Sequence, residues 1–239
     1  MKRTKRRRRL LRIAVGAAGV GVLAFVALAL ALLHIPAWYR PVGVPAERLQ
    51  EVRDGLADKF GEISDQMVRG RPFDVVFDHR VVSEWIVSRG EIWPDADRWI
   101  PPWLRDPLIV FTSERIILAA HLDRNGWESI VAVHFCVSVE NEEVVIRLDR
   151  VTSGAVPIPL AALARPLEGL VRSERLDVEM MPDEVAAVVR KLRTVPLVEY
   201  LTEGVRYDRP LVWRNGDRPY RIIGVRLEPG RLVLRIRPL

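Results

Sequence analysis

The sequence predicts an α+β protein: an N-terminal transmembrane helix is followed by one exported domain, in which an antiparallel meander sheet is covered by helices. Three observations support this fold class. Residues 13–35 form a run of 23 residues without a formal charge. Between Ala46 and Val68 apolar residues recur at spacings of three and four, which is the period of a helix. From Leu108 onward the period changes to two, which is the period of strands.

The uncharged run is long enough to cross a bilayer. As a helix with a rise of about 1.5 Å per residue it would extend roughly 35 Å, against a hydrocarbon core of ~30 Å. Residues 1–12 carry eight Lys and Arg, and this one-sided charge predicts a cytoplasmic N-terminus. Trp38 and Tyr39 follow the run, as aromatic residues do where a helix leaves lipid. We therefore expect a single-pass protein of the cell membrane whose main domain is extracytoplasmic.

These features divide the chain into a cytoplasmic basic segment (1–12), the transmembrane helix (13–35), a juxtamembrane linker (36–44) and an extracytoplasmic α+β domain (45–239). The alternative for the N-terminus is a cleaved signal peptide, because Ala27, Ala29 and Ala31 resemble a cleavage site. A signal peptide has an apolar region of about 7–15 residues, and a polar break follows it. Here the apolar run is longer and continues to Ile35, which favours an uncleaved anchor.

The charge of the chain does not indicate a nucleic-acid partner. The formal net charge is +6, but without residues 1–12 the chain holds 29 Lys and Arg against 31 Asp and Glu. The basic character is therefore mostly a signal for membrane topology. One basic stretch remains, because residues 201–239 hold nine Arg and four acidic residues. These arginines either form the solvated face of strands or contact anionic lipid headgroups or an acidic partner.

Turn signals separate the alternating segments and predict hairpins at Asn125–Gly126, Asn141–Glu143, Asn215–Gly216 and Pro229–Gly230. Helix 46–68 either packs on its own domain, dimerises or lies on the membrane, and Phe60 belongs to its apolar face. A second helix, capped by Asp78, is expected to turn Val81, Val82, Trp85 and Ile86 inward. The expected helices are 46–68, 78–89, 160–171 and 182–193, and the expected strands are 73–77, 108–112, 115–123, 127–139, 144–148, 223–227 and 232–236.

Three Trp and four Pro are concentrated in Glu91–Pro107. The prolines exclude a regular helix and a central strand. The indole rings either cover one end of the core, form a lid or reach the membrane interface. Together with basic side chains of the last alternating segment they are the candidate contacts for a ligand or the membrane: Trp93, Trp99, Trp103, Arg231, Arg235 and Arg237.

The sequence contains no recognisable catalytic constellation. It lacks the nucleophile elbow, the zinc-protease helix, the phosphate-binding loop and the dinucleotide fingerprint. His134 and Cys136 share a strand face and could supply two metal ligands or a thiolate–imidazole pair. A tetrahedral metal site needs more ligands, and Cys136 is the only cysteine, so a buried structural role is favoured for both. Asp95 and Asp97 are interpreted as solvated turn residues rather than a sugar-binding pair. We expect no cofactor, no metal and no disulfide within the chain.

The order of elements resembles a known family. A cationic N-terminus and a single anchor precede a strand and helix near Phe73–Ile86, a strand meander, and a Gly-x-x-Pro-x-Pro-Leu break. That break consists of Gly154, Pro157, Pro159 and Leu160. Over roughly Phe73–Val171 the chain resembles the YpmS-type family of membrane-anchored bacterial proteins of unknown function, so the resemblance implies no activity. More distantly, the plan is similar to that of exported bacterial domains that bind phospholipid, an analogy at the level of fold.

Two functions follow from these features. The first is a non-enzymatic, membrane-anchored binding domain for lipid or another apolar ligand, because a sheet covered by helices can enclose an apolar groove. The same pattern is also typical of an ordinary filled core. The second is an envelope scaffold or protein-interaction protein that works through helix 46–68, the Trp/Pro stretch or the Arg-rich end, with an envelope protein as its partner. An unrecognised hydrolase or metal enzyme is the less favoured alternative.

Overall fold

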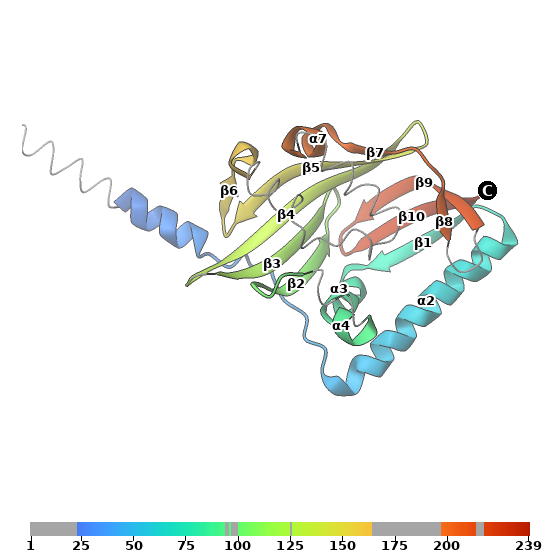
Figure 1. Cartoon of the computed structure of the whole chain (residues 1–239), viewed down its shortest axis with the longest axis horizontal. Coiled ribbons are helices and arrows are strands. Elements are labelled where there is room, and N and C mark those ends of the chain that lie inside the picture. The colour runs from blue at the N-terminus through green and yellow to red at the C-terminus, as the bar shows by residue number, and fades with distance from the viewer. Residues whose placement is uncertain (1–22, 94–95, 97–99, 125, 164–196, 214–217) are drawn as a thin grey trace, which may run out of the picture.

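The structure is a computed structural model that describes residues 23–93, 96, 100–124, 126–163, 197–213 and 218–239. Within these residues the fold is α+β with two antiparallel sheets and a few helices, which confirms the α+β, antiparallel part of the predicted fold class (Figure 1). The expectation of a single meander sheet was incomplete, because strands from both ends of the domain form a second sheet.

A six-stranded sheet contains the predicted meander, with the strand order β2-β3-β4-β5-β6. The short strand β7 also pairs with β5. Asn141 and Glu142, which join β4 to β5, have φ values of 52° and 65°, the signs that a two-residue type I′ turn requires. The bounds are β2 Leu104–Phe111, β3 Ile116–Arg124, β4 Trp127–Glu140, β5 Glu143–Ser153, β6 Val156–Ile158 and β7 Val205–Tyr207.

A four-stranded sheet has the order β1-β10-β9-β8 and brings an early strand beside the C-terminal hairpin. Its register runs from Phe73 opposite Ile236 to Asp78 opposite Arg231. The predicted turn at Pro229–Gly230 joins β9 to β10, and Gly230 has a φ of 85°. The Asn215–Gly216 turn lies outside the described residues. The bounds are β1 Phe73–Asp78, β8 Leu211–Trp213, β9 Arg218–Glu228 and β10 Arg231–Pro238.

Helix α2 (Leu49–Arg69) packs on the four-stranded sheet (Figure 1). It follows the short helix η1 (Ala46–Arg48), so the predicted helix 46–68 is confirmed. Ile63 and Met67 form a core cluster with Val75 of β1 and Ile236 of β10. Phe60 was predicted to face the core but is more exposed, and its ring meets the edge of the Trp213 ring at a centroid distance of 5.7 Å.

The region of the second predicted helix forms two helices, α3 (His79–Val87) and α4 (Arg89–Ile92). Asp78 caps α3 as predicted, because its Oδ1 accepts a hydrogen bond from the Arg80 N–H at 2.8 Å. Val81 was predicted to face inward, but its side chain is 40% exposed.

Ser83 and Glu84 are the buried residues of α3, and Ser83 lies where the helix packs against the edge strand β2. The Ser83 Oγ lies 2.7 Å from the carbonyl oxygen of His79 and 3.1 Å from that of Ile109. It also accepts a hydrogen bond from the Ile109 N–H at 3.2 Å. The hydroxyl thus satisfies backbone groups that an edge strand would otherwise leave to water.

Two further helices were predicted in residues that the structure describes only in small part. Residues 160–163 are helical, while 164–171 and the whole of 182–193 lie outside the described residues. A helix that the periodicity did not indicate, α7 (Leu197–Glu203), precedes β7.

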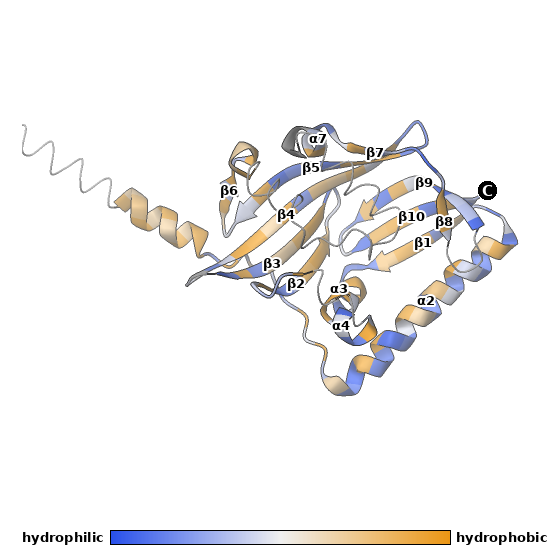
Figure 2. Ribbon diagram, viewed as in Figure 1, coloured by the Kyte–Doolittle hydropathy of each residue, from blue (hydrophilic) through white to orange (hydrophobic). Residues whose placement is uncertain are grey.

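Residues 23–32 form an apolar helix that extends away from both sheets (Figures 1 and 2). Its large side chains, including Leu23, Phe25 and Leu30, are exposed. Among the described residues, no helix combines the length and the apolarity that crossing a membrane requires. Residues 13–22 of the predicted span lie outside the described residues, so the transmembrane helix stays a prediction.

The end of this helix is hydrogen-bonded to the six-stranded sheet. The Ala155 N–H donates to the carbonyl oxygen of Ala31 at 2.8 Å, and the Ser129 hydroxyl donates to that of Leu32 at 2.7 Å. Gly154 has a φ of 58°, and a Cβ there would overlap both carbonyl oxygens. Ser129 also lies 2.7 Å from the Ser153 hydroxyl, so the helix end docks on β4 and β5. We call this set of contacts the helix-end junction.

Residues 36–44, predicted as a juxtamembrane linker, contribute to the core. Tyr39 is buried in a cluster that includes Leu108, Ile117 and Ile130, and Val42 packs beside it. The Tyr39 hydroxyl donates to the carbonyl oxygen of Asp106 at 2.8 Å. Burial raises the pKa of Tyr39 to about 12, so its hydroxyl stays protonated and can donate this hydrogen bond over the whole physiological pH range.

The helix-end junction predicts that Gly154→Ala destabilises the chain more than Gly126→Ala. Both glycines have positive φ, which costs an alanine about 1–2 kcal/mol. Only at Gly154 does the new methyl group meet backbone oxygens, which adds a further ~1–3 kcal/mol of overlap, whereas Gly126 borders open space. Urea unfolding of the full chain in detergent measures both changes. Equal losses of unfolding free energy would show that the junction is absent in solution.

Candidate apolar binding site

A cavity of about 320 Å³ lies beside β2, β3 and β4, and we call it the apolar groove. Every described residue that lines it is apolar. The paired strands β3 and β4 form its floor. Its walls include Ile86 of α3 and, from the Trp/Pro stretch, Ile100, Pro101 and Leu104. Ligand pockets of proteins begin at about 300 Å³, so the groove is large enough for a small apolar group or part of a lipid chain.

The strand register explains why the groove forms on this face of the sheet. Leu118 pairs with Val133, and Ala120 pairs with Val131, so these four side chains share one face. The alternating residues of β4, Ile130 and Ala132, are buried on the other face, where Tyr39 covers them. The described residues provide no comparable cover for the groove face, and Leu118 remains 41% exposed.

Sequence reasoning missed the groove residues because their pattern is that of any strand with one buried face. The available signal was the size of the side chains. Ala119 and Ala120, which line the groove, lie in the middle of β3, where larger β-branched residues are more usual. A short side chain such as that of Ala120 leaves room that neighbouring side chains do not fill.

Trp93 and Trp103, the candidate tryptophans that the structure describes, are not among the residues that line the groove. Trp103 is half-buried at the start of β2, and the Arg124 guanidinium lies over its ring at 5.4 Å from the ring centroid. Trp93 is exposed at the end of α4. Trp99 lies outside the described residues, as do Asp95 and Asp97.

The candidate arginines belong to β10 in the other sheet, so the structure does not bring them together with the tryptophans. Arg237 is paired with Glu142 of the β4–β5 turn at 2.6 Å, and Arg235 lies 4.0 Å from Asp74. Arg231 is exposed at the start of the strand. The hydrogen bond from Arg237 lowers the pKa of Glu142. This pair joins the two sheets, which gives Arg237 a structural role.

His134 is buried as predicted, with 5% of its surface exposed, whereas Cys136 is half-buried. Among the residues that the structure describes, neither ring nitrogen of His134 finds a hydrogen-bond partner. Burial, with a smaller contribution from the nearby Arg150 and Arg115, lowers the pKa of His134. In the described part of the chain, no group of three or more His, Cys, Asp or Glu is arranged to hold a metal ion.

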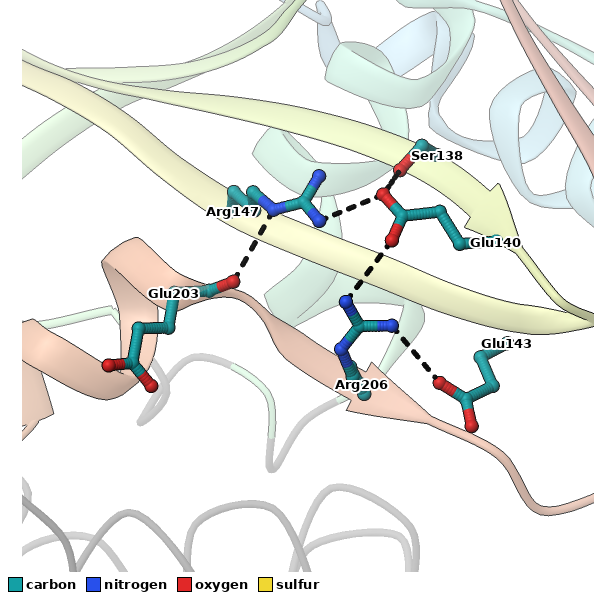
Figure 3. A network of polar contacts seen from close by, with 6 residues as sticks. All are labelled: Ser138, Glu140, Glu143, Arg147, Glu203 and Arg206. Atoms are coloured by element: carbon teal, nitrogen blue, oxygen red, sulfur yellow. Dashed lines mark hydrogen bonds and ion pairs between the residues drawn. The ribbon is translucent and has the colours of Figure 1, made fainter.

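A polar network fastens β7 to the β4–β5 hairpin, at a distance from the groove (Figure 3). Glu140 accepts hydrogen bonds from Arg147 at 2.8 Å and Arg206 at 3.2 Å. Arg206 also reaches Glu143, and Arg147 donates to the backbone oxygen of Glu203. The hydrogen bond from Arg147 lowers the pKa of Glu140, so the carboxylate stays ionised in mild acid. The charges are paired with one another, which indicates a structural network.

The comparisons with known proteins gave no match: no family model, no curated protein and no solved structure is significantly similar to this chain. The functional argument therefore depends on the geometry of the chain itself.

The lowered pKa of His134 predicts that stability falls in mild acid. The unfolded histidine takes up a proton near its ordinary pKa of about 6.5, while the buried ring remains neutral, so the unfolded state binds more protons as pH falls. We expect the free energy of unfolding to decrease between about pH 7 and pH 5, and His134→Leu to reduce that slope. Urea unfolding at several pH values measures this pH dependence of the unfolding free energy. If His134→Leu left the dependence unchanged, His134 would not be its cause.

Proposed function

We propose that this chain is a single-pass membrane protein whose extracytoplasmic domain binds a lipid or another apolar ligand in the apolar groove, without catalysing a reaction. The observation that carries this proposal is the lining of the groove. A cavity whose described walls are entirely apolar has no group that would orient a polar substrate, but it suits a hydrocarbon chain. Each methylene group that leaves water for such a site contributes about 0.8 kcal/mol.

Two observations support the anchor: the pattern of charges in the sequence and the exposure of apolar side chains in the N-terminal helix. Eight basic residues precede an uncharged run at 13–35, which favours a cytoplasmic N-terminus. In the described part of that run, Leu28, Leu30 and Leu33 are exposed at 49%, 65% and 51%. Exposed apolar surface of this extent is unfavourable in water and favourable in lipid.

The helix-end junction supports the combination of anchor and groove. Because the end of the apolar helix is hydrogen-bonded to Ser129 and Ala155, the domain follows the helix without a long flexible connection. A lipid that leaves the bilayer would then need to travel only a short way to reach the groove. The proposal thus assigns to the domain the task of holding an apolar molecule close to the membrane.

The proposed topology predicts which reporter fused after Leu239 is active. Alkaline phosphatase folds only outside the cytoplasm, so its fusion should be active, while a green fluorescent protein fusion should be dark. The control is the same pair of fusions on residues 36–239, which lack the anchor and should reverse the result. A fluorescent full-length fusion with an inactive phosphatase would overturn the membrane topology.

The groove predicts that Leu118→Glu abolishes binding of an apolar probe while Ile146→Glu does not. Both side chains are similarly exposed on strands of the same sheet, at 41% and 39%, but only Leu118 lines the groove. A carboxylate there would have to lose its hydration to accept hydrocarbon. The measurement is fluorescence titration of the full chain with 1-N-phenylnaphthylamine, together with native mass spectrometry of co-purified lipid. Equal binding by the two variants would exclude the groove as the site.

A further inference from the structure

A second cavity, of about 570 Å³, lies between the segment that follows the N-terminal helix and the start of α3. Three basic side chains line it, those of Arg40, His79 and Arg80, and no described acidic residue does. Trp38 and Val42 supply apolar contact on the same walls. We call it the basic cavity, and it is distinct from the groove in both composition and charge.

The charge of the basic cavity is largely uncompensated. Arg40 is exposed and has no ion-pair or hydrogen-bond partner in the described chain. Arg80 lies 3.7 Å from Glu84, which also pairs with Arg48 at 3.3 Å. The Glu84 side chain is only 9% exposed, but that of Arg80 is 71% exposed and the pair runs through its Nε atom at 3.7 Å, so most of the guanidinium faces solvent. Both guanidinium groups are therefore available to an anion.

His79 adds a third nitrogen group to the cavity wall. Its backbone N–H donates to the carbonyl oxygen of Gly230 at 2.9 Å, which fixes the start of α3. The Nδ1 atom of its ring is buried, and no group in the described part of the chain forms a hydrogen bond with it. The acidic residue beside it, Asp78, is already engaged, because its carboxylate caps the Arg80 N–H.

The chain position of the cavity points to the membrane surface. Arg40 follows the apolar helix after a few residues, and the helix-end junction holds the helix to the same domain. Trp38 is partly exposed, as indole rings are at the level of lipid headgroups. Arginine is also the side chain that best matches phosphate oxygens, because its planar fork can donate two parallel hydrogen bonds.

We propose that the basic cavity binds a phosphate group, which Arg40 and Arg80 neutralise while Trp38 and Val42 contact the carbon atoms attached to it. The phosphate comes from a lipid headgroup or from free phosphate, and the chemistry of recognition is the same for both. This inference goes beyond the proposed function, because it concerns another cavity and holds whether or not the groove takes an apolar ligand. Only the lipid source depends on the membrane anchor.

The test uses the full chain in dodecyl maltoside, a detergent without phosphate. Line broadening in ³¹P NMR is measured with inorganic phosphate and, separately, with dihexanoyl phosphatidylglycerol. The variant Arg40→Gln/Arg80→Gln is compared with Arg69→Gln/Arg71→Gln, which removes the same charge from exposed arginines outside the cavity. We expect the first variant to bind at least tenfold more weakly than the unmodified chain and the second to bind unchanged.

Binding of both probes would support free phosphate as a ligand, and binding of the lipid alone would support a headgroup. Equal binding by the two double variants, or no binding of either probe, would overturn the proposal. Leu118→Glu separates the two cavities, because it should keep phosphate binding while it loses the apolar probe. Conversely, Arg40→Gln/Arg80→Gln should keep the apolar probe, so the failure of one site is distinguishable from the failure of the other.

Discussion

The hydrogen bonds at the end of the N-terminal helix are the constraint on which the arrangement of this chain depends. The last carbonyl groups of a helix have no partners within it and need donors from elsewhere. Here the Ser129 hydroxyl and the Ala155 N–H supply them, and Gly154 allows the backbones to approach. The following residues enter the core directly through Tyr39. The apolar helix is therefore a part of the domain rather than a separate segment, and both cavities keep a defined relation to it.

The two faces of the six-stranded sheet are covered unequally, and this inequality creates the apolar groove. On one face Tyr39 packs over Ile130 and Ala132. On the other, Leu118 and Val133 face a space that α3 and the Trp/Pro stretch border without filling. Period-two alternation identifies the faces of a strand but not what covers each of them. A groove and a filled core give the same pattern, which is why the sequence left both interpretations open.

Local features of the fold were predictable and long-range ones were not. The turn at Asn141–Glu142 and the periodicity of α2 depend on neighbouring residues, and both predictions are confirmed. The pairing of β1 with β10 depends on segments at opposite ends of the domain, and no local pattern indicates it. Burial of Ser83 in place of Val81 likewise depends on a neighbouring strand. The candidate tryptophans and arginines were grouped by chemical type alone. The arginines lie on β10, whereas Trp93 ends α4 and Trp103 directly precedes β2.

The edges of the six-stranded sheet are closed to strand addition from another molecule. On β2, the Ser83 hydroxyl occupies the backbone groups of Ile109, and the register is interrupted at Asp106 and Pro107. The opposite edge is divided between β6 and β7, which have three residues each, and the central Pro157 of β6 has no N–H to donate. If the proposed anchor holds the chain in a membrane, its copies meet there at high local density. These edges would let many copies crowd together there without their sheets merging into aggregates.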